Sequence, residues 1–466
     1  MPKSWTQAPR VAVVGGGLAG LSAACALAES GLQVTLFERR PYLGGRASSY
    51  QHPSTGEVVD NCQHVLLGCC TNLLEFYRRL GVEDKIRWYD RMTFIEPGGR
   101  TSVISPSFWP APLHTAPAFL RAACLGFTDK LAIAAAMAAL APNTFRDKGE
   151  SFLQWLKRHG QTDRAIERFW KTVLVSALNE DVDRVSVPYA AQVMRESFLK
   201  SREAGRMGVP TVPLTDLYNV AGEYVERRGG RVSFRANVES FRADFSGVKL
   251  LLDEADASFD FVVLAVPFDV LARMLPLTSA GDPLRQTLAQ FESSPITGVH
   301  LWFDRQITGL EHAVLLDRTI QWMFHKSKLL GRDNGSGSYV ELVISSSKGL
   351  VEKSRAEITD LAVAELEEFF PAVGHAKLLK STVIKEVHAT YSPRPGIESY
   401  RPQPETVWPR VFLAGDWTAT GWPATMEGAV RSGYLAAQCV ARVAGIQDAA
   451  FLVPDLPPSG FMKLLG

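Results

Sequence analysis

The sequence predicts a mixed α/β (α+β) fold in which both ends of the chain form one domain and the middle forms another. A strand, a glycine-rich turn and a helix open the chain at residues 10–29, and a strand, a turn and a helix recur at residues 410–443. A largely helical stretch and a second group of strand-like segments lie between them. A chain of 466 residues exceeds what one hydrophobic core usually supports, which also favours two or three domains.

The N-terminal segment has the pattern of a β-α-β unit that binds a dinucleotide. The β-rich run 10–14 is followed directly by Gly15-x-Gly17-x-x-Gly20 and by an alanine-rich helix over 19–29. Gly15 permits the tight turn, Gly17 lets the backbone approach a pyrophosphate, and Gly20 lets the helix pack close to the strand. The helix N-terminus then faces the anion with its N–H groups and partial positive charge. We therefore predict a Rossmann-like domain.

The residues after this helix distinguish the candidate cofactors. A second strand over 33–37 is closed by Glu38, whose carboxylate can accept hydrogen bonds from ribose hydroxyls and would repel the 2′-phosphate of NADP. Gly44-Gly45-Arg46 follows, where the glycine pair permits close passage of the backbone and Arg46 supplies a cation for a pyrophosphate. The Glu-x(5)-Gly-Gly-Arg pattern resembles the glycine-doublet flavoproteins, so the expected cofactor is FAD.

The C-terminal segment is expected to hold the reactive half of the same cofactor. A strand over 410–414 ends at Gly415-Asp416, and a helix begins near Met426. An acid at the carboxyl end of a strand in an open α/β sheet lies where such sheets bind ligands, and its carboxylate suits the ribityl hydroxyls. The helix N-terminus at Met426 can stabilise negative charge on the pyrimidine ring of a reduced flavin.

Two further segments are candidates for contact with FAD. In the glycine-doublet flavoproteins the chain after Gly-Gly-Arg returns past the flavin, which makes Gln63 and His64 candidates for the flavin or substrate face; the alternative for His64 is a core histidine. Val238 ends a strand-like run over 231–238 and is either a backbone contact of the adenine or an ordinary core residue. The full set of residues that we expect at the cofactor is Gly15, Gly17, Leu18, Ala19, Gly20, Glu38, Arg39, Gly45, Arg46, Gln63, His64, Val238, Gly415, Asp416 and Met426.

Composition and cysteine spacing disfavour several other classes of function. The net charge is +1 with both signs interspersed, which argues against nucleic-acid binding. The six cysteines are sparse and irregular, which suggests reduced thiols in a cytoplasmic protein. We expect no metal, because the adjacent pair Cys69-Cys70 would chelate one tetrahedral ion poorly. No apolar run reaches the roughly 20 residues of a membrane span, and no signal peptide is expected.

The middle of the chain is expected to supply the substrate domain. Residues 108–145 are rich in aromatic, proline and alanine residues and poor in charge, which fits either a helical cap packed on the core or an apolar lip that admits a lipid-like substrate and touches a membrane. Strand-like runs over 87–95 and 101–104 flank a Pro-Gly-Gly turn and predict a hairpin. The expected domains are 1–105, 205–290 and 385–466 for FAD binding, and 106–204 and 291–384 for substrate binding with a helical cap.

The chain resembles hydroxysqualene dehydroxylase, a family also called squalene-associated FAD-dependent desaturase. That family belongs with the carotenoid and phytoene desaturases in the flavin amine oxidase superfamily and serves bacterial squalene and hopanoid synthesis. The resemblance covers about residues 10–442, and one departure is Cys62, where the family usually has glycine, which puts the space beside the flavin and the substrate choice in doubt. The segments that carry it are Asp60-Asn61-x-Gln63-His64-Val-Leu-Leu-Gly68, Met207-Gly-Val-Pro210, Leu301-Trp-Phe-Asp304 and Ala414-Gly-Asp-Trp-Thr418, followed by Pro423-Ala-Thr-x-Glu427-Gly-Ala-Val-Arg-Ser-Gly433.

The resemblance implies removal of the hydroxyl of a C30 allylic alcohol, hydroxysqualene, with hydride from reduced flavin to give squalene. Ionisation of the C–O bond needs an acid, and His64 and Tyr391 are our candidate catalytic proton donors because each lies in a segment expected near the flavin. A single dinucleotide fingerprint implies an external electron donor for FAD. The resemblance further implies a hydrophobic isoprenoid substrate, peripheral contact with the inner face of the cytoplasmic membrane, and association with squalene-pathway enzymes.

Three other functions fit the same sequence. Reversed electron flow would make the protein a desaturase of squalene, phytoene or a related polyene. The cofactor motifs also fit an amine oxidase or a protoporphyrinogen oxidase. A non-catalytic flavin-binding scaffold for squalene synthases belongs to another class, and would bind FAD tightly without turning over any isoprenoid.

Overall fold

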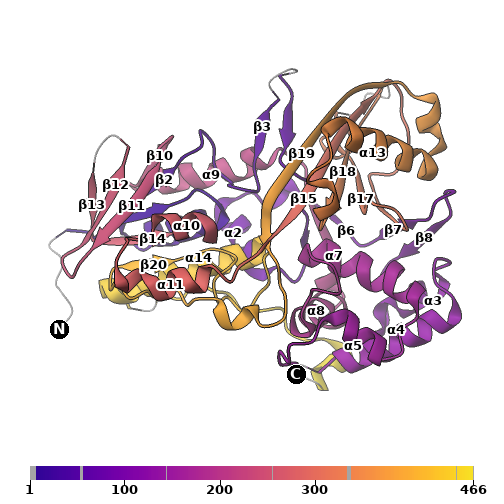
Figure 1. The fold of residues 1–466 in the computed structure, drawn as a ribbon, viewed down its shortest axis with the longest axis horizontal. Helices are drawn as coiled ribbons and strands as arrows, with labels where there is room; N and C mark the ends of the chain where they lie inside the picture. The colour runs from indigo at the N-terminus through magenta and orange to yellow at the C-terminus, as the bar shows by residue number, and fades with distance from the viewer. Residues whose placement is uncertain are drawn as a thin grey trace.

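The computed structural model describes residues 7–52, 56–142, 144–253, 256–332, 337–447 and 449–464. Two halves lie side by side (Figure 1). One is layered and contains both the first strand and the last long helix of the chain. The other consists of a second sheet above a group of helices, and the C-terminus lies against these helices.

Five parallel strands form the sheet of the layered half, in the order β10-β2-β1-β14-β20. Along β1, Val11 and Val13 pack into one hydrophobic core, and Ala12 and Val14 into another on the opposite face. Burial on both faces accounts for the uninterrupted apolar run of this strand. The bounds are β1 Arg10–Val14, β2 Gln33–Glu38, β10 Arg231–Phe234, β14 Phe261–Leu264 and β20 Val411–Leu413.

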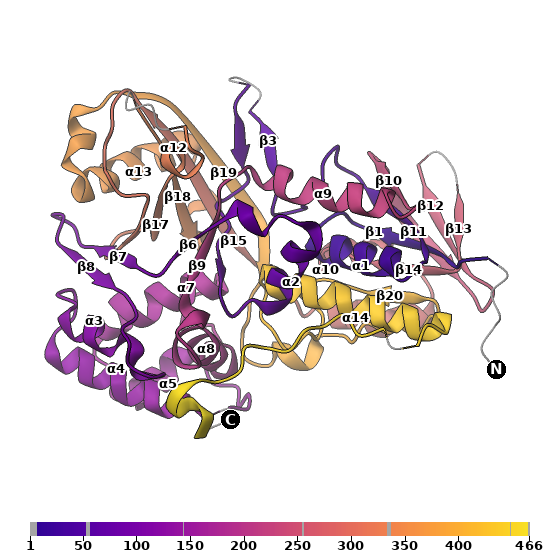
Figure 2. The same ribbon diagram turned by 180° about the vertical axis from the view of Figure 1, so that it is seen from behind.

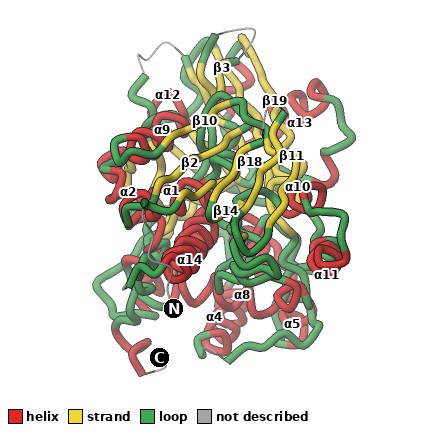
Figure 3. The backbone as a smooth tube through the Cα atoms, turned by 90° about the vertical axis from the view of Figure 1, so that its left-hand side faces the viewer, coloured by secondary structure: helices red, strands yellow, loops and turns green. Residues whose placement is uncertain are grey.

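Helices cover one face of this sheet, and a three-stranded antiparallel sheet covers the other (Figure 3). The first and last long helices pack closely because Gly433 has no side chain: a Cβ there would overlap Ser22 Oγ and the carbonyl oxygen of Ala19. The helices are α1 Leu18–Glu29, α2 Thr71–Leu80, α9 Leu214–Glu226 and α14 Met426–Ala444 (Figure 2). The opposite face carries β11 Val238–Ala243, β12 Val248–Leu252, β13 Ala257–Phe259, α10 Phe268–Met274 and α11 Asp282–Leu288.

A seven-stranded sheet of order β19-β15-β18-β17-β16-β7-β8 forms the upper part of the second half. Two of its strands, β15 and β19, are long and antiparallel and reach toward the layered half (Figure 1). The elements are β7 Met92–Ile95, β8 Thr101–Ile104, β15 Ser293–Phe303, β16 His312–Leu315, β17 Trp322–His325, α12 Lys326–Leu329, β18 Ser338–Ser345, α13 Arg355–Phe369 and β19 Leu378–Tyr391.

Small sheets and a helical group complete the molecule. β3 pairs with β4, and β9 lies between β5 and β6. None of the helices in the described ranges is both long and apolar enough to cross a bilayer. The small strands are β3 Ser49–Gln51, β4 Val58–Asp60, β5 Leu66–Leu67, β6 Ile86–Tyr89 and β9 Met207–Pro210, and the helices are α3 Ala116–Arg121, α4 Phe127–Leu140, α5 Phe152–Arg158, α6 Asp163–Ala165, α7 Thr172–Leu178 and α8 Val187–Met194.

The predicted fold class is confirmed, and several element boundaries need correction. The run 87–95 is two strands in different sheets, because β6 pairs with β9 whereas β7 pairs with β8 and β16. The run 231–238 is interrupted at Arg235, which adopts a left-handed backbone with φ of 53°. The predicted domain limits do not coincide with the ends of the sheets: β7 and β8 fall inside 1–105 yet join the seven-stranded sheet, and β19 crosses residue 385.

Candidate cofactor and active site

The two glycine motifs of the N-terminal region lie against each other. The N–H of Gly44 donates to the carbonyl oxygen of Gly16 at 2.8 Å, and Gly17 forms a parallel bridge with Gly44. A Cβ on Gly45 would lie 2.9 Å from the Cα of Gly17, and a Cβ on Gly20 would overlap the carbonyl oxygen of Gly15. Gly17, the residue before α1, is partly exposed, and the first-turn N–H groups of the helix have no intrahelical acceptor.

Glu38 is buried beside this loop, with 7% of its surface exposed. Its Oε2 atom accepts a hydrogen bond from the N–H of Gly16 at 2.7 Å, and Oε1 accepts one from the N–H of Arg40 at 2.7 Å. Each oxygen retains a lone pair for a ribose hydroxyl. Arg39, which we expected at the cofactor, is exposed, whereas Arg40 folds back and donates to the carbonyl oxygen of Gly45 at 3.1 Å.

Arg46 and Asp416 form an ion pair that joins the first motif of the chain to the last. The Arg46 Nη2 atom lies 2.8 Å from Asp416 Oδ1, and Nη1 donates to the carbonyl oxygen of Ala389 at 2.5 Å. The Asp416 carboxylate is buried, so its charge requires such a partner. The guanidinium therefore contacts a carboxylate and a carbonyl, two partners that the expectation of a cation for the pyrophosphate did not include.

The C-terminal motif is shaped by backbone geometry. Gly415 has φ of +153°, and a Cβ there would overlap the Trp417 indole ring, so only glycine fits this turn. α14 begins at Met426, and Thr425 caps it by accepting a hydrogen bond from the N–H of Gly428 at 3.1 Å. The first turn of α14 is thus fixed at the carboxyl edge of the sheet, where its N–H groups can face an anion.

The segment after Gly-Gly-Arg lies beside the cofactor motif. Asn61 Nδ2 donates to the carbonyl oxygen of Arg46 at 3.1 Å. His64 is half-buried, and its Nδ1 atom lies 2.8 Å from the carbonyl oxygen of Cys62. A carbonyl oxygen only accepts, so Nδ1 carries the hydrogen and Nε2 of the neutral ring is an acceptor. Burial lowers the pKa of His64 below its ordinary value, which favours this neutral form.

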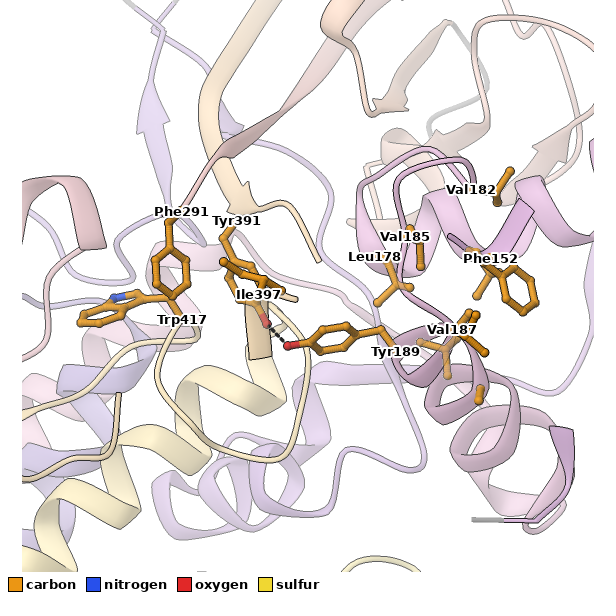
Figure 4. Close-up of a cluster of buried hydrophobic side chains, with 14 of the residues drawn as sticks. Phe152, Leu178, Val182, Val185, Val187, Tyr189, Phe291, Tyr391, Ile397 and Trp417 are labelled. Carbon is orange, nitrogen blue, oxygen red and sulfur yellow. Dashed lines mark hydrogen bonds between the residues drawn. The ribbon is translucent and has the colours of Figure 1, made fainter. Parts of the chain in front are cut away.

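Tyr391 lies at the end of β19 in an aromatic cluster with Phe291 and Trp417, and only 1% of it is exposed (Figure 4). Tyr189 donates its single hydroxyl hydrogen to Glu398, so Tyr391 is the donor in the 3.0 Å hydrogen bond between the two phenols. Burial raises the pKa of Tyr391 to about 12, so the phenol stays neutral. Its proton points toward Tyr189 in this structure.

Val238 begins β11 and is paired with Leu252, so its side chain belongs to the core on that face of the parallel sheet. Cys62 packs in an apolar cluster with Met207 on β9 and with Phe324 and Val343 of the seven-stranded sheet. This cluster borders the segment that carries His64. Sequence reasoning missed Arg40 and Tyr189 and gave Asn61 only as part of the resemblance, because the partners of these residues lie on other segments.

The residues at this edge of the sheet fit FAD. The space above Gly17 is open, since a Cβ there would meet its nearest neighbour, Gly45 Cα, only at 3.9 Å. Glu38 offers lone pairs for a ribose, and two helix N-termini, those of α1 and α14, face the same edge. These features define the class of protein: a dinucleotide-binding α/β protein whose N-terminal and C-terminal motifs meet at one edge of the parallel sheet.

Comparison with known proteins identifies the family. The family model described as flavin containing amine oxidoreductase matches residues 18–441, and the chain belongs to this family. The chain is 28% identical over 460 residues to 15-cis-phytoene desaturase of Synechococcus elongatus, covering 92% of this chain and 95% of that protein. It is 28% identical over 470 residues to 15-cis-phytoene desaturase of Solanum lycopersicum, covering 96% of this chain and 79% of that protein.

A solved structure of similar fold is a triple mutant of putrescine oxidase, with a TM-score of 0.70 and 19% identity over 94% of this chain and 99% of that one. The family and the dinucleotide fingerprint together identify the protein as an FAD-dependent oxidoreductase, so the predictions of an enzyme and of FAD are confirmed.

Proposed function

We propose that the protein acts on a C30 isoprenoid and converts hydroxysqualene to squalene. The observation that carries this proposal is the run Asp60–Gly68, which resembles the dehydroxylase pattern except at Cys62 and is hydrogen-bonded to Arg46 beside the cofactor motif. The relatives named for phytoene, a long polyene, support a hydrocarbon substrate. When bound, reduced FAD supplies the hydride that replaces the hydroxyl.

The chain's own residues suit an apolar substrate at this position. The cluster of Cys62, Met207, Phe324 and Val343, with Trp322 packed against it, borders the His64 segment and excludes water from that side. An apolar surrounding of this kind would favour a hydrocarbon chain and would shield an allylic cation from water. A proton that Tyr391 donates would be resupplied from solvent through the hydroxyl of Tyr189 and the carboxyl group of Glu398. Glu398 can take up that proton because 49% of its side chain is exposed.

Replacement of His64 or Tyr391 by phenylalanine is expected to lower turnover of hydroxysqualene by about 100-fold while FAD stays bound, which is a typical contribution of a general acid. His64 would first need a proton on Nε2, whereas Tyr391 would need its hydroxyl to rotate away from Tyr189. Steady-state rates and FAD content test this, with His375→Phe and Tyr400→Phe as exposed controls. Near-normal turnover in both site variants would remove both residues from the mechanism.

The second candidate, desaturation of squalene, phytoene or a related polyene, is favoured by the names of the relatives. Product analysis separates the two. FAD-loaded protein would be incubated anaerobically with a chemical reductant and hydroxysqualene, and separately with squalene or phytoene and an electron acceptor. Squalene formed only in the first reaction supports dehydroxylation, whereas polyene products formed only in the second would replace it with desaturation.

We propose a separate electron donor for the flavin, because the sequence has one dinucleotide fingerprint.

We propose peripheral contact with the cytoplasmic membrane through an exposed apolar patch of the helical group. The C-terminal turn joins this patch, since the N–H of Phe461 donates to the carbonyl oxygen of Ala111 at 2.8 Å. Exposed Arg121 and Lys463 lie in the same segments and would favour anionic lipid. The patch consists of Phe108, Trp109, Leu113, Leu120, Phe127, Leu131, Phe461 and Leu464.

The double substitution Phe127→Glu with Leu131→Glu is expected to lower binding to vesicles containing anionic lipid by about 100-fold or more, because each buried apolar side chain contributes roughly 1.5–3 kcal/mol. Vesicle co-sedimentation measures the effect. Leu277→Glu is the matched control, since Leu277 is 95% exposed but lies outside the patch. Equal loss in the control, or no loss in the double variant, would contradict the assignment of this surface.

A further inference from the structure

A buried charge cluster lies behind the segment that carries His64. Lys326 opens α12 directly after β17, and its side chain is 2% exposed. Its Nζ atom donates to Asp60 Oδ2 at 2.6 Å and to Gln63 Oε1 at 2.8 Å. Glu341 on β18 is fully buried, with Oε2 3.5 Å from the same Nζ atom. We call Asp60, Lys326 and Glu341 the buried triad.

The buried triad joins the two halves of the molecule at this segment. Asp60 ends β4 and accepts a hydrogen bond from the N–H of Leu214, which opens α9 in the layered half. Lys326 belongs to the half with the seven-stranded sheet. Gln63 is held at both ends of its amide, because Oε1 accepts from Lys326 and Nε2 donates to the carbonyl oxygen of His64 at 3.0 Å.

One ammonium group faces two carboxylates in this cluster. Burial would raise the pKa of Asp60, but the Lys326 ammonium and further hydrogen bonds outweigh it and hold that pKa below its ordinary value. Burial, reinforced by the charge of Asp60 and opposed by Lys326, raises the pKa of Glu341 to about 7. Among the residues that the structure describes, Cys62, His300 and Tyr339 are further titratable groups that face Glu341.

Those three neighbours stay neutral near pH 7. Burial raises the pKa of Cys62 and of Tyr339 well above their ordinary values, and it lowers that of His300 to about 3. Glu341 is therefore the member of this group that changes charge near neutrality. A change in the charge of Glu341 alters its electrostatic attraction for the Lys326 ammonium. This in turn affects the hydrogen bonds that Lys326 donates to Asp60 and Gln63.

We propose that Lys326 is a positioning residue that holds residues 61–64 against the cofactor motif through Asp60 and Gln63, with Glu341 as the proton-dependent member of the cluster. The link to the motif is the hydrogen bond from Asn61 to Arg46. The inference rests on the proposed function only for the turnover measurement below, and the spectroscopic and stability measurements need no substrate.

The first test follows the visible circular dichroism of bound FAD in the holoenzyme between pH 5 and pH 9, which reports the surroundings of the flavin. The wild type is expected to change with a midpoint at about 7, the pKa of Glu341, and Glu341→Gln to lose this change. Glu365→Gln, at a buried glutamate bonded to the N–H groups of Thr319 and Ile320, is expected to keep it. A midpoint retained in Glu341→Gln, or absent from the wild type, overturns the role of Glu341.

Thermal unfolding gives an independent readout of the same group. The folded-state pKa of Glu341 lies above its ordinary value of 4.5, so its contribution to stability is present below about pH 4.5 and is lost as the pH rises through about 7. The Tm of Glu341→Gln relative to the wild type should therefore rise between pH 5 and pH 8. A difference that is constant over this range would contradict the proposal.

The second test separates positioning from folding. Lys326→Met is expected to lower kcat by about 100-fold, the effect of displacing a reacting group by roughly 1 Å, and to change the flavin circular dichroism. Lys200→Met, at a buried lysine 2.7 Å from Glu196 in the helical group, is the control. Lys326→Met alone leaves the buried Asp60 carboxylate without its cation. Adding Asp60→Asn removes that charge, so the double variant should recover the Tm that the single variant lost, but not its kcat.

The proposal is overturned if kcat recovers together with Tm, which would make the role of Lys326 structural. It is also overturned if Lys326→Met leaves the flavin circular dichroism unchanged. If no variant and no wild-type protein turns over hydroxysqualene, the proposed reaction fails, whereas the dichroism and Tm results still decide the role of the cluster.

Discussion

Substitution of Gly20 by alanine is expected to weaken FAD binding severely. A Cβ at this position would overlap the carbonyl oxygen of Gly15 and lie 3.2 Å from the Cβ of Ala265. These neighbours belong to the loop after β1 and to the end of β14 and cannot rotate away, so α1 must shift from the sheet. Its N-terminus then no longer faces the pyrophosphate. Binding should fall by about 100-fold or more, measured as quenching of FAD fluorescence.

Gly309→Ala is the matched control, since nothing lies within 4 Å of a Cβ there and the backbone is not left-handed. Circular dichroism and the Tm of the apoprotein show whether the Gly20 variant is folded. Gly45→Ala provides a second variant, because its Cβ would lie 2.9 Å from Gly17 Cα and its φ is +61°. Normal FAD affinity in both folded variants would show that the dinucleotide does not bind across these two motifs.

Loss of the Arg46–Asp416 ion pair is expected to weaken FAD binding by roughly 30-fold, about 2 kcal/mol. Arg46→Met leaves the buried Asp416 carboxylate without its cation, and it also releases the carbonyl oxygen of Ala389. The loss of binding free energy should lie at the low end of the range seen when one partner of a buried ion pair is removed, because 35% of the Arg46 side chain is exposed. Arg46→Lys should restore little, since an ammonium cannot reach both oxygens with the geometry of a guanidinium.

A double-mutant cycle distinguishes a coupled pair from two separate contacts. If the pair acts as a unit, Arg46→Met combined with Asp416→Asn should bind FAD no more weakly than the worse single variant. Arg442→Met is the control, because Arg442 and its partner Glu405 form an exposed ion pair. Additive losses in the cycle would mean that each residue contacts FAD independently, as the sequence alone suggested.

The parts of the fold that local pattern determines were predictable. The amphipathic stripe of residues 71–80 and the glycine that follows it predict a helix with the limits of α2, and Gly81 ends that helix in the left-handed conformation with φ of 69°. The first strand was predicted for a similar reason, since burial on both faces leaves an apolar run. The strand β19 was missed: few of its residues are buried, so its sequence shows no sustained alternation of apolar and polar side chains.

The contacts that define the site join residues far apart in the chain. Arg46 and Asp416 are separated by 370 positions, and Lys326 and Asp60 by 266. The sequence predicted Arg46 and Asp416 as cofactor residues from their motifs but could not indicate that they pair. Lys326 lies in no motif, and a buried lysine is unusual enough that only its partners explain it. For Tyr391, the direction of its proton depends on Tyr189 in a distant helix.

The most direct test of the proposed reaction is a single turnover without oxygen. Purified protein with stoichiometric FAD would be photoreduced, mixed with hydroxysqualene, and followed by visible flavin absorbance, with squalene quantified by mass spectrometry. Our account predicts reoxidation of the flavin with one squalene formed per FAD. Flavin that stays reduced, with hydroxysqualene recovered unchanged, would contradict it.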